Sequence, residues 1–360
     1  MKYQDEYRDK DKARKIVEKI KELSKKRVNF MEVCGTHTMS IFRHGIKGML
    51  PGNIRLLSGP GCPVCVTPNE YIDKAVELAR KKDVVVVTFG DMIKVPGTSS
   101  SLEKEKSDKK DIRIVYSPSE AVSIAEKEKN KQVVFLGVGF ETTSPTVAAA
   151  ILEAQEKKIK NFSVLCAHKL IPPAIEALLG SKKVKIDGFI LPGHVSVIIG
   201  ERPYKFIAFK YGKPAVIMGF EPVDILSGIY MLVYQVESNN ALIANQYKRA
   251  VHYEGNAAAI EMMDRVFERA DSEWRGIGII PNSGLKIRDA FSEFDAEKKF
   301  VIKTARSKEK KGCICGSILR GEKTPEECKL FRKICTPENP MGACMVSSEG
   351  TCAAYFKYSC

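Results

Sequence analysis

The sequence has no long uninterrupted run of apolar residues, which argues against a membrane-spanning helix. Such a helix needs about 18 or more consecutive apolar residues. The nearest approach, residues 189–199, is short and contains Pro192, Gly193 and His194. The first 27 residues are dense in Lys, Arg, Asp and Glu, which is not the pattern of a secretory signal. We therefore expect a cytoplasmic protein, whose thiols stay reduced unless they bind metal or take part in redox chemistry.

Aromatic residues do not accompany the many basic side chains. The formal net charge is +14, but the lysines at 104–110 and 308–311 alternate with Glu and Asp. Without aromatic residues among them, stacking on nucleic-acid bases is not supported. We interpret the charge as a solvated, lysine-rich surface and predict no nucleic-acid partner. An acidic protein partner is the alternative.

Short apolar runs predict strands that are buried on both faces of parallel sheets. They span residues 84–89, 112–116, 133–138, 162–167, 188–191 and 216–220. Helical patterns separate most of them, at residues 69–81, 119–129, 145–158 and 172–179. Because strands and helices alternate, we expect α/β sheets whose functional loops follow the carboxyl ends of the strands.

We predict two parallel-sheet α/β domains and a largely helical third domain. The domains are assigned to residues 27–117, to residues 118–220, and to residues 221–360 together with an amphipathic helix at 8–26. In the third domain, helical patterns and no long strand run are visible at residues 223–236, 239–251 and 257–269. We expect this domain to end in a metal-binding tail.

Seven cysteines lie within the last 48 residues. From Cys315, gaps of 12, 6 and 16 residues lead to the next three favoured positions, and these gaps are too irregular for a zinc ribbon of paired CxxC motifs. Four thiolates from irregular loops suit a [4Fe–4S] cluster, with structural zinc as the alternative. The favoured ligands are Cys315, Cys328, Cys335 and Cys352. Spacing leaves two choices open, Cys313 against Cys315 and Cys344 against Cys352, and makes the terminal Cys360 the weakest candidate.

Near the N-terminus, Cys62 and Cys65 form a CxxC pair. This spacing allows the two thiols to close into a disulfide. The helix expected at 69–81 begins just past the pair, and its partial positive charge would favour a thiolate. We interpret the pair as a redox dithiol. Half of a zinc site is the alternative, although no second CxxC lies within local reach.

Cys34 stands alone in the segment 32–37. A single cysteine is most often a small buried apolar residue. Here Gly35 leaves the neighbouring backbone accessible, and His37 and His44 are candidates to hold the thiol deprotonated. A thiolate beside a histidine is the pattern of a nucleophile or a metal ligand, so we favour a functional role.

Polar residues also follow two of the predicted strands. The loop 137–143 lacks the Gly-Lys-Ser/Thr ending of a nucleotide-binding loop and the glycine spacing of a dinucleotide-binding motif, and Glu141 would repel phosphate. We interpret Glu141 as part of a hydrogen-bonding wall around a reactive centre. His194, in the segment 191–196, is a second candidate of this kind. For both residues the alternative is a loop side chain that is satisfied locally.

Taken together, these segments resemble the HypD family of hydrogenase maturation factors. The resemblance covers nearly the whole chain, and its motifs are long. The matching segments are residues 32–37, 57–65, 139–143, 192–196, 315–321, 335–337 and 344–352.

The resemblance implies a scaffold on which the iron centre of nickel–iron hydrogenases is built, an iron with two cyanides and one carbon monoxide. It implies that Cys34 holds this iron together with the N-terminal cysteine of the small chaperone HypC. It implies that the cluster supplies electrons to Cys62 and Cys65, and that the cyanide arrives as thiocyanate on the C-terminal cysteine of HypE. On this basis Glu141, His37 and His194 are expected to bond the cyanide nitrogens or to steer protons.

Two further functions stay open from the sequence. The first is a cluster-dependent oxidoreductase that acts on a protein disulfide and needs only the CxxC pair and the cluster. The second is an interaction module stabilised by zinc. The scaffold differs from both because it requires Cys34. Whether the protein is itself an enzyme is left undecided.

Overall fold

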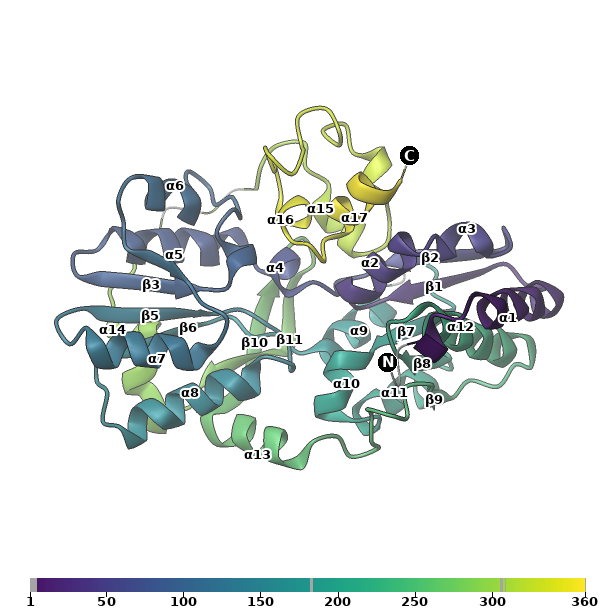
Figure 1. Cartoon of the computed structure of the whole chain (residues 1–360), viewed down its shortest axis with the longest axis horizontal. Coiled ribbons are helices and arrows are strands. Elements are labelled where there is room, and N and C mark those ends of the chain that lie inside the picture. Colours follow the sequence, from purple (N-terminus) through teal and green to yellow (C-terminus); the bar gives the residue numbers. More distant parts are fainter. Residues whose placement is uncertain (1–4, 182–183, 305–306, 308, 360) are drawn as a thin grey trace.

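The computed structural model describes residues 5–181, 184–304, 307 and 309–359. They form two lobes side by side, each built on a parallel sheet, and the cysteine-rich tail sits over the junction (Figure 1). The predicted α/β class with two parallel sheets is confirmed. Among the described residues, none of the helices has the length and apolar character needed to cross a bilayer.

Sheet A has five parallel strands in the order β2–β1–β7–β8–β9. Their bounds are β1 Val28–Glu32, β2 Ile54–Ser58, β7 Gly188–Pro192, β8 Ala215–Met218 and β9 Ile243–Asn245. Every residue of β7 and β8 is buried, as expected for central strands that are covered on both faces.

Sheet B has four parallel strands in the order β4–β3–β5–β6. Their bounds are β3 Val84–Thr88, β4 Ile112–Ile114, β5 Gln132–Gly137 and β6 Phe162–Cys166. The four consecutive valines of β3 favour a strand because branching at Cβ restricts χ1 and fits the pleated surface. All six strands expected from apolar runs are present, four in sheet B and two in sheet A.

The two sheets are interleaved along the chain. The chain leaves sheet A after β2, builds the whole of sheet B, and returns to sheet A at β7. The sheets therefore group the strands differently from the predicted ranges 27–117 and 118–220, and the domain boundaries stay a prediction. Residues 221–360 contribute to both lobes, because α12 (Pro222–Glu237) packs on β8 of sheet A and α14 (Ala296–Lys299) contacts β6 of sheet B.

Helices cover the outer faces of both sheets. The amphipathic helix expected at 8–26 is α1, in which Asp9 caps the first turn and Val17 and Ile20 are buried. It packs on α12. The α-helices are α1 Lys10–Leu23, α2 Gly35–Arg43, α3 Ile46–Met49, α4 Pro63–Val66, α5 Asn69–Arg80, α6 Leu102–Ser107, α7 Pro118–Lys127, α8 Ser144–Glu156, α9 Ile171–Gly180, α10 Gly193–Ile199, α11 Lys205–Phe209, α12 Pro222–Glu237, α13 Ala257–Val266, α14 Ala296–Lys299, α15 Cys315–Leu319, α16 Ala343–Val346 and α17 Thr351–Tyr358.

The third predicted domain is less helical than expected. The helix predicted at 239–251 is wrong, since this segment holds the edge strand β9 followed by turns. The helix predicted at 257–269 ends at Val266. From there the chain forms an antiparallel hairpin of β10 Phe267–Trp274 and β11 Gly278–Ile287, which stands between the two lobes (Figure 1).

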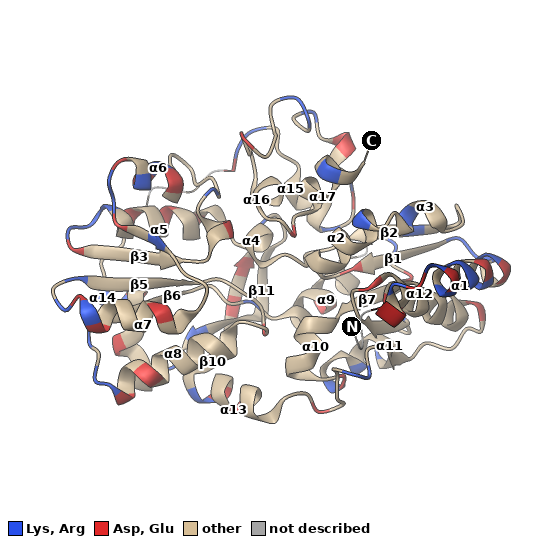
Figure 2. Ribbon diagram, in the orientation of Figure 1, with Lys and Arg blue, Asp and Glu red and all other residues tan. Residues whose placement is uncertain are grey.

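The charged side chains are distributed over the outside of the molecule. In Figure 2, Lys and Arg are interspersed with Asp and Glu along α1 and over the outer loops of both lobes. The ribbon around α4, α15 and α16, where the lobes meet the tail, is mostly free of charged residues. One buried core joins the two sheets here and includes Cys62, Cys65, Cys315 and Cys344.

Candidate thiol and metal site

Cys34 lies between β1 and the first turn of α2, and its side chain is only 8% exposed. The glycine-rich loop after β2 packs directly on its backbone. Gly35 N–H donates to the carbonyl of Gly61 over 2.8 Å. A Cβ on Gly61 would lie 2.1 Å from the backbone nitrogen of Cys34, so only glycine allows this approach.

The thiol of Cys34 is held in its neutral form in the metal-free chain. Burial is the largest effect and the negative charge of Glu349 the next, and together they raise the pKa of Cys34 to about 12. Hydrogen bonds from the backbone N–H groups of His37 and Thr36 lower the pKa but are weaker. The expectation that His37 and His44 would keep this thiol deprotonated is wrong. A bound soft cation would instead have to stabilise the thiolate.

The side chain of His37 is engaged with sheet A. Its Nε2 lies 3.1 Å from the carbonyl oxygen of Met218 and 3.0 Å from that of Gly219, so Nε2 carries the proton and donates it. Burial lowers the pKa of His37 to about 4, and the ring is neutral. Its Nδ1 is buried and has no hydrogen-bond partner among the described residues, which leaves one lone pair unused.

Phe220 contacts both candidate histidines. Its ring stacks on His37 at a centroid distance of 4.6 Å and on His194 at 3.9 Å. His194 has an exposed side chain, and partial burial lowers its pKa. The structure thus brings the two histidines to the same aromatic residue, one buried and one open to solvent.

Glu141 lies in the loop that follows β5, with 2% of its surface exposed. Its Oε1 accepts a hydrogen bond from Ile171 N–H at 3.0 Å, while Oε2 is buried and no described residue bonds to it. Burial raises the pKa of Glu141 to about 7. The residue lines a cleft of about 1410 Å³ beside the hairpin. No hydrogen bond joins it to Cys34 or to either candidate histidine within the described part of the chain.

Tyr204 is a site residue that the sequence did not reveal. It is fully buried, and its hydroxyl lies 3.4 Å from Ser196 Oγ. Burial raises the pKa of Tyr204, and the charges of Glu141 and Cys34 act in the same direction. Tyr204 is therefore a buried hydroxyl close enough to both Glu141 and Cys34 to be affected by their charges.

Cys62 and Cys65 are joined by a disulfide and are both buried. The helix expected just past the pair is confirmed as α5, which begins at Asn69. A separate one-turn helix, α4, starts at Pro63 and includes Cys65 itself. Cys62 is the N-cap, and its Sγ accepts a hydrogen bond of 3.2 Å from Cys65 N–H. The pair thus belongs to a helix start, where the partial positive charge favours a thiolate once the bond is reduced.

The tail cysteines line one pocket. All four favoured ligands are there, and so are both alternatives, so the structure leaves the choice of ligands open. Cys315 and Cys344 have their sulfur atoms 2.8 Å apart. Cys360 lies outside the described residues. The cysteines that line the pocket are Cys313, Cys315, Cys328, Cys335, Cys344 and Cys352.

The donor set of this pocket fits an iron–sulfur cluster. Its described lining consists of thiols and apolar residues, with no carboxylate or imidazole. Burial raises the pKa of Cys335 and Cys352, so these thiols need a cationic partner to become thiolates. In the described part of the chain, no three His, Cys, Asp or Glu side chains converge on one point as ligands of a single ion. A cluster has several irons, which bind thiolates spread around a cavity.

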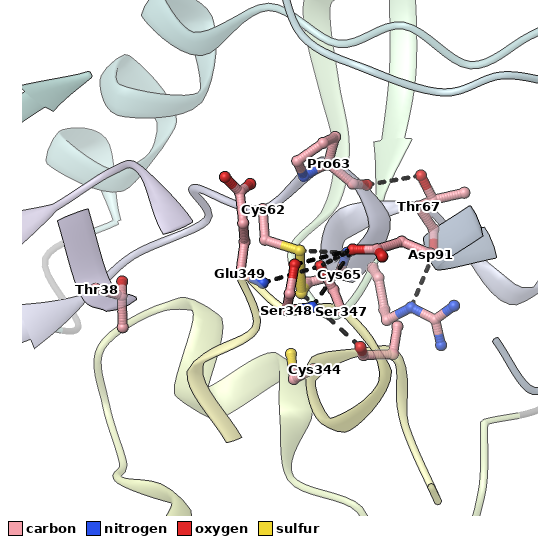
Figure 3. Close-up of a disulfide and its surroundings, with 12 residues drawn as sticks. Thr38, Cys62, Pro63, Cys65, Thr67, Asp91, Cys344, Ser347, Ser348 and Glu349 are labelled. Carbon is pink, nitrogen blue, oxygen red and sulfur yellow. Dashed lines mark hydrogen bonds between the residues drawn. A yellow bond between two sulfur atoms is a disulfide. The ribbon is translucent and has the colours of Figure 1, made fainter. Parts of the chain in front are cut away.

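The disulfide and the thiol pocket are neighbours. Cys65 Sγ lies 4.0 Å from the carbonyl oxygen of Ala343, the residue before Cys344, and Figure 3 shows Cys344 beside the disulfide. The next tail residues reach Cys34, because Thr36 donates a hydrogen bond of 2.5 Å to Glu349. The tail segment 343–349 therefore contacts the disulfide at one end and the Cys34 loop at the other.

Comparisons with known proteins agree with this arrangement of motifs. A family model named HypD and described as "Hydrogenase formation hypA family" matches residues 11–359. The chain belongs to the HypD family. It is 48% identical to the hydrogenase maturation factor HypD of Cupriavidus necator, over 99% of this chain and 97% of the relative. It is 47% identical to HypD of Azotobacter vinelandii, with the same coverage.

A relative from an archaeon is similar over the same length. The putative hydrogenase expression/formation protein of Methanocaldococcus jannaschii is 46% identical, over 97% of this chain and 98% of that protein. The resemblance to the HypD family that the motifs indicated is thus confirmed along the chain. The roles of the individual site residues remain predictions.

Proposed function

We propose that this chain is a scaffold for assembly of the Fe(CN)2CO centre of nickel–iron hydrogenase, with Cys34 as the iron-binding thiolate. Membership of the HypD family supports a role in hydrogenase maturation. The observation that carries the finer proposal is the continuous contact from Cys34 through the disulfide to the thiol pocket. Iron is the cargo of this reaction, and the proposed setting is the cytoplasm.

The number of electrons that the reaction needs follows from the chemistry of the cyanide donor. Release of cyanide from a thiocyanate leaves a thiolate and a cyanide ion, and this cleavage consumes two electrons. A dithiol at Cys62 and Cys65 supplies both electrons when it closes to the disulfide and releases two protons. A [4Fe–4S] cluster, when bound in the tail pocket, supplies single electrons that restore the dithiol. The proposed ligands are Cys315, Cys328, Cys335 and Cys352.

His37, His194 and Glu141 are assigned roles that follow from their protonation states and exposure. His37 offers the unused lone pair of a neutral ring, and His194 is open to solvent and to an incoming partner. Glu141, whose pKa is raised to about 7, can donate or accept a proton near neutrality. We propose that Glu141 and His194 donate hydrogen bonds to the cyanide nitrogens or move protons, and that the Nδ1 lone pair of His37 accepts a proton. HypC as co-ligand and HypE as cyanide donor complete the proposal.

Infrared spectroscopy of the anaerobic complex with the small chaperone HypC tests this function. The expected result is a set of bands from iron-bound cyanide and carbon monoxide, which Cys34→Ala abolishes. Cys166→Ala is the matched control, because burial raises the pKa of Cys166 to about 12 as well, and it lies at the end of β6 away from the tail. Bands that persist in Cys34→Ala would refute the scaffold role.

The contact between the disulfide and the thiol pocket also favours a second candidate, a cluster-dependent protein-disulfide oxidoreductase. This function requires Cys62, Cys65 and the cluster but not Cys34. A disulfide reductase assay with an artificial electron donor separates the two candidates. If Cys34→Ala keeps full reductase activity and the wild type forms no cyanide-ligated iron, the second candidate holds.

A further inference from the structure

Arg275 is a buried cation that pairs with no carboxylate among the residues that the structure describes. Only 4% of its surface is exposed, and it forms no ion pair within the described residues. Its backbone N–H donates to the carbonyl of Val66 at 2.8 Å, and its Nε–H donates to that of Thr67 at 2.8 Å. Nη1 donates to the side chain of Asn69, while Nη2 is buried and has no hydrogen-bond partner in the described part of the chain.

The turn that carries Arg275 touches both sulfur centres. Val66 is the last residue of α4, the helix of the disulfide. On the other side, Gly276 has a φ of +69° and packs against Gly316, the residue after Cys315, where a Cβ would lie 2.1 Å from the Gly316 Cα. The turn between β10 and β11 therefore lies between α4 and α15.

A second arginine holds the same turn but is neutralised. Arg320 Nη1 donates to the carbonyl of Gly276, and its guanidinium also pairs with Glu322 through bonds of 2.7 and 2.8 Å. The two arginines thus make similar anchoring bonds and differ in charge balance. Comparing variants of the two arginines therefore distinguishes the effect of holding the turn in place from the effect of an unpaired positive charge.

A buried unpaired guanidinium is costly unless an anion lies near it. Glu70, Glu273 and Glu309 line the same cavity as Arg275 but form no ion pair with it within the described residues. The two sulfur centres lie on either side of its turn. The turn of Arg275 contacts Val66, next to Cys65, and Gly316, next to Cys315, so its charge is close to both sulfur centres. The potential of an iron–sulfur centre responds to such nearby charge.

We propose that Arg275 is a positioning residue that gives the Cys62–Cys65 pair and the thiol pocket a shared buried positive charge and so favours their reduced forms. Reduction of the disulfide takes up two electrons, breaks the Sγ–Sγ bond and leaves one thiolate and one thiol after uptake of one proton. The cation stabilises that thiolate. The part of the proposal that concerns the tail cofactor rests on the proposed function, whereas the part that concerns the disulfide does not.

The experiment uses the full chain, purified without oxygen, in four variants. Arg275→Gln removes the charge and keeps a hydrogen-bond donor. Asn69→Asp keeps Arg275 but gives its Nη1 a carboxylate partner. Arg275→Lys keeps the charge, and Arg320→Met removes the second anchor. Thermal unfolding shows which variants are folded.

Two quantities are measured for each variant. The first is the equilibrium constant for reduction of Cys62–Cys65 by dithiothreitol, which supplies both electrons and closes to its cyclic disulfide; alkylation and mass spectrometry read the fraction reduced. The second is the midpoint potential of the tail cluster, followed by electron paramagnetic resonance. We expect Arg275→Gln and Asn69→Asp to lower the disulfide constant about tenfold, which is about 30 mV for two electrons. Both variants also shift the cluster midpoint to more negative potential.

Arg275→Lys is expected to keep most of the wild-type value of both quantities, and Arg320→Met to lower stability without moving either. Unchanged disulfide constants in folded Arg275→Gln and Asn69→Asp would overturn the proposal. So would an equal shift in Arg320→Met, which would assign the effect to anchoring. Iron and sulfide analysis of the wild type separately decides whether the cluster exists. If it does not, the proposed function fails, and the disulfide constants still decide the role of Arg275.

Discussion

Thr36 and Glu349 are 313 residues apart in sequence and share a hydrogen bond of 2.5 Å. This bond fastens the cysteine-rich tail to the loop that carries Cys34. It also places a carboxylate beside the Cys34 thiol, and that charge helps to raise the pKa of the thiol after burial. The tail therefore does more than hold its own cysteines, because it influences the candidate iron ligand directly.

Removing this carboxylate makes Cys34 more reactive. In Glu349→Gln the amide can still accept from Thr36, but the negative charge is gone, so the pKa of Cys34 falls. The rate of Cys34 alkylation at pH 8 is expected to rise about threefold to tenfold, since one pH unit changes the thiolate fraction tenfold. Mass spectrometry of the metal-free chain measures this rate. Glu338→Gln, at an exposed tail position, is the control, and an unchanged rate in Glu349→Gln would refute the link.

Gly61 is predicted to be a glycine of the site that alanine cannot replace without a cost in stability. In Gly61→Ala the methyl group would lie 2.1 Å from Cys34 N, so either the loop or the start of α2 must move. We expect a loss of about 1–3 kcal/mol in the free energy of unfolding, measured with urea. Gly52→Ala is the matched control, because open space surrounds that position, and its expected change is within about 0.5 kcal/mol. Equal effects in both variants would contradict the packing argument.

Helices and strands could be predicted from the sequence where a pattern within the segment itself determines its structure. The consecutive valines of β3 and the capped, amphipathic α1 were found because their signals lie within the segment itself. β1 was missed because polar Asn29 and Glu32 interrupt a strand of five residues. β10 was missed because its charged and small side chains alternate on a half-exposed hairpin and give no apolar run. The helical pattern of the preceding segment also extends into the first residues of the strand.

The site divides in the same way. The cysteines were recognisable because their chemistry and spacing are local. Tyr204, Glu349 and Arg275 were missed because their meaning depends on partners far away in sequence, such as Thr67, which is 208 residues from Arg275. The thiol chemistry of Cys34 was wrongly predicted for a related reason. Sequence shows nearby histidines, but it does not show that burial outweighs them.

Glu141 is expected to make stability depend on pH. Its pKa is about 7 in the folded chain and near 4.5 when unfolded, so the folded state binds more protons between these values. Its contribution is fully present below pH 4.5 and is lost as the pH rises through 7. Glu141→Gln removes this titration. Relative to wild type, the variant should gain about 3 kcal/mol in the free energy of unfolding between pH 4.5 and 8.

Urea unfolding of both proteins at the two pH values measures this difference. His37 works in the opposite sense, since its pKa of about 4 makes its contribution present above pH 6.5 and lost as the pH falls through 4. That effect is common to both proteins and cancels in the comparison. Glu261→Gln, on the exposed rim of the same cleft, should follow the wild type. A pH-independent difference between wild type and Glu141→Gln would mean that Glu141 is not buried as described.

Serine substitution of each of the six cysteines that line the tail pocket, one at a time, should show which thiols hold the cofactor. If the pocket binds a [4Fe–4S] cluster, four substitutions lower the iron and sulfide content of the anaerobically purified chain severalfold, and two leave it nearly intact. The four predicted to lower it are Cys315, Cys328, Cys335 and Cys352. Cys344→Ser is the most informative of these variants. The sulfur of Cys344 is 2.8 Å from that of Cys315, and the neighbouring Ala343 contacts Cys65. If Cys344→Ser lost iron and Cys352→Ser kept it, Cys344 would replace Cys352 in the predicted set of ligands. Zinc in place of iron and sulfide throughout would remove the electron supply from the proposed function.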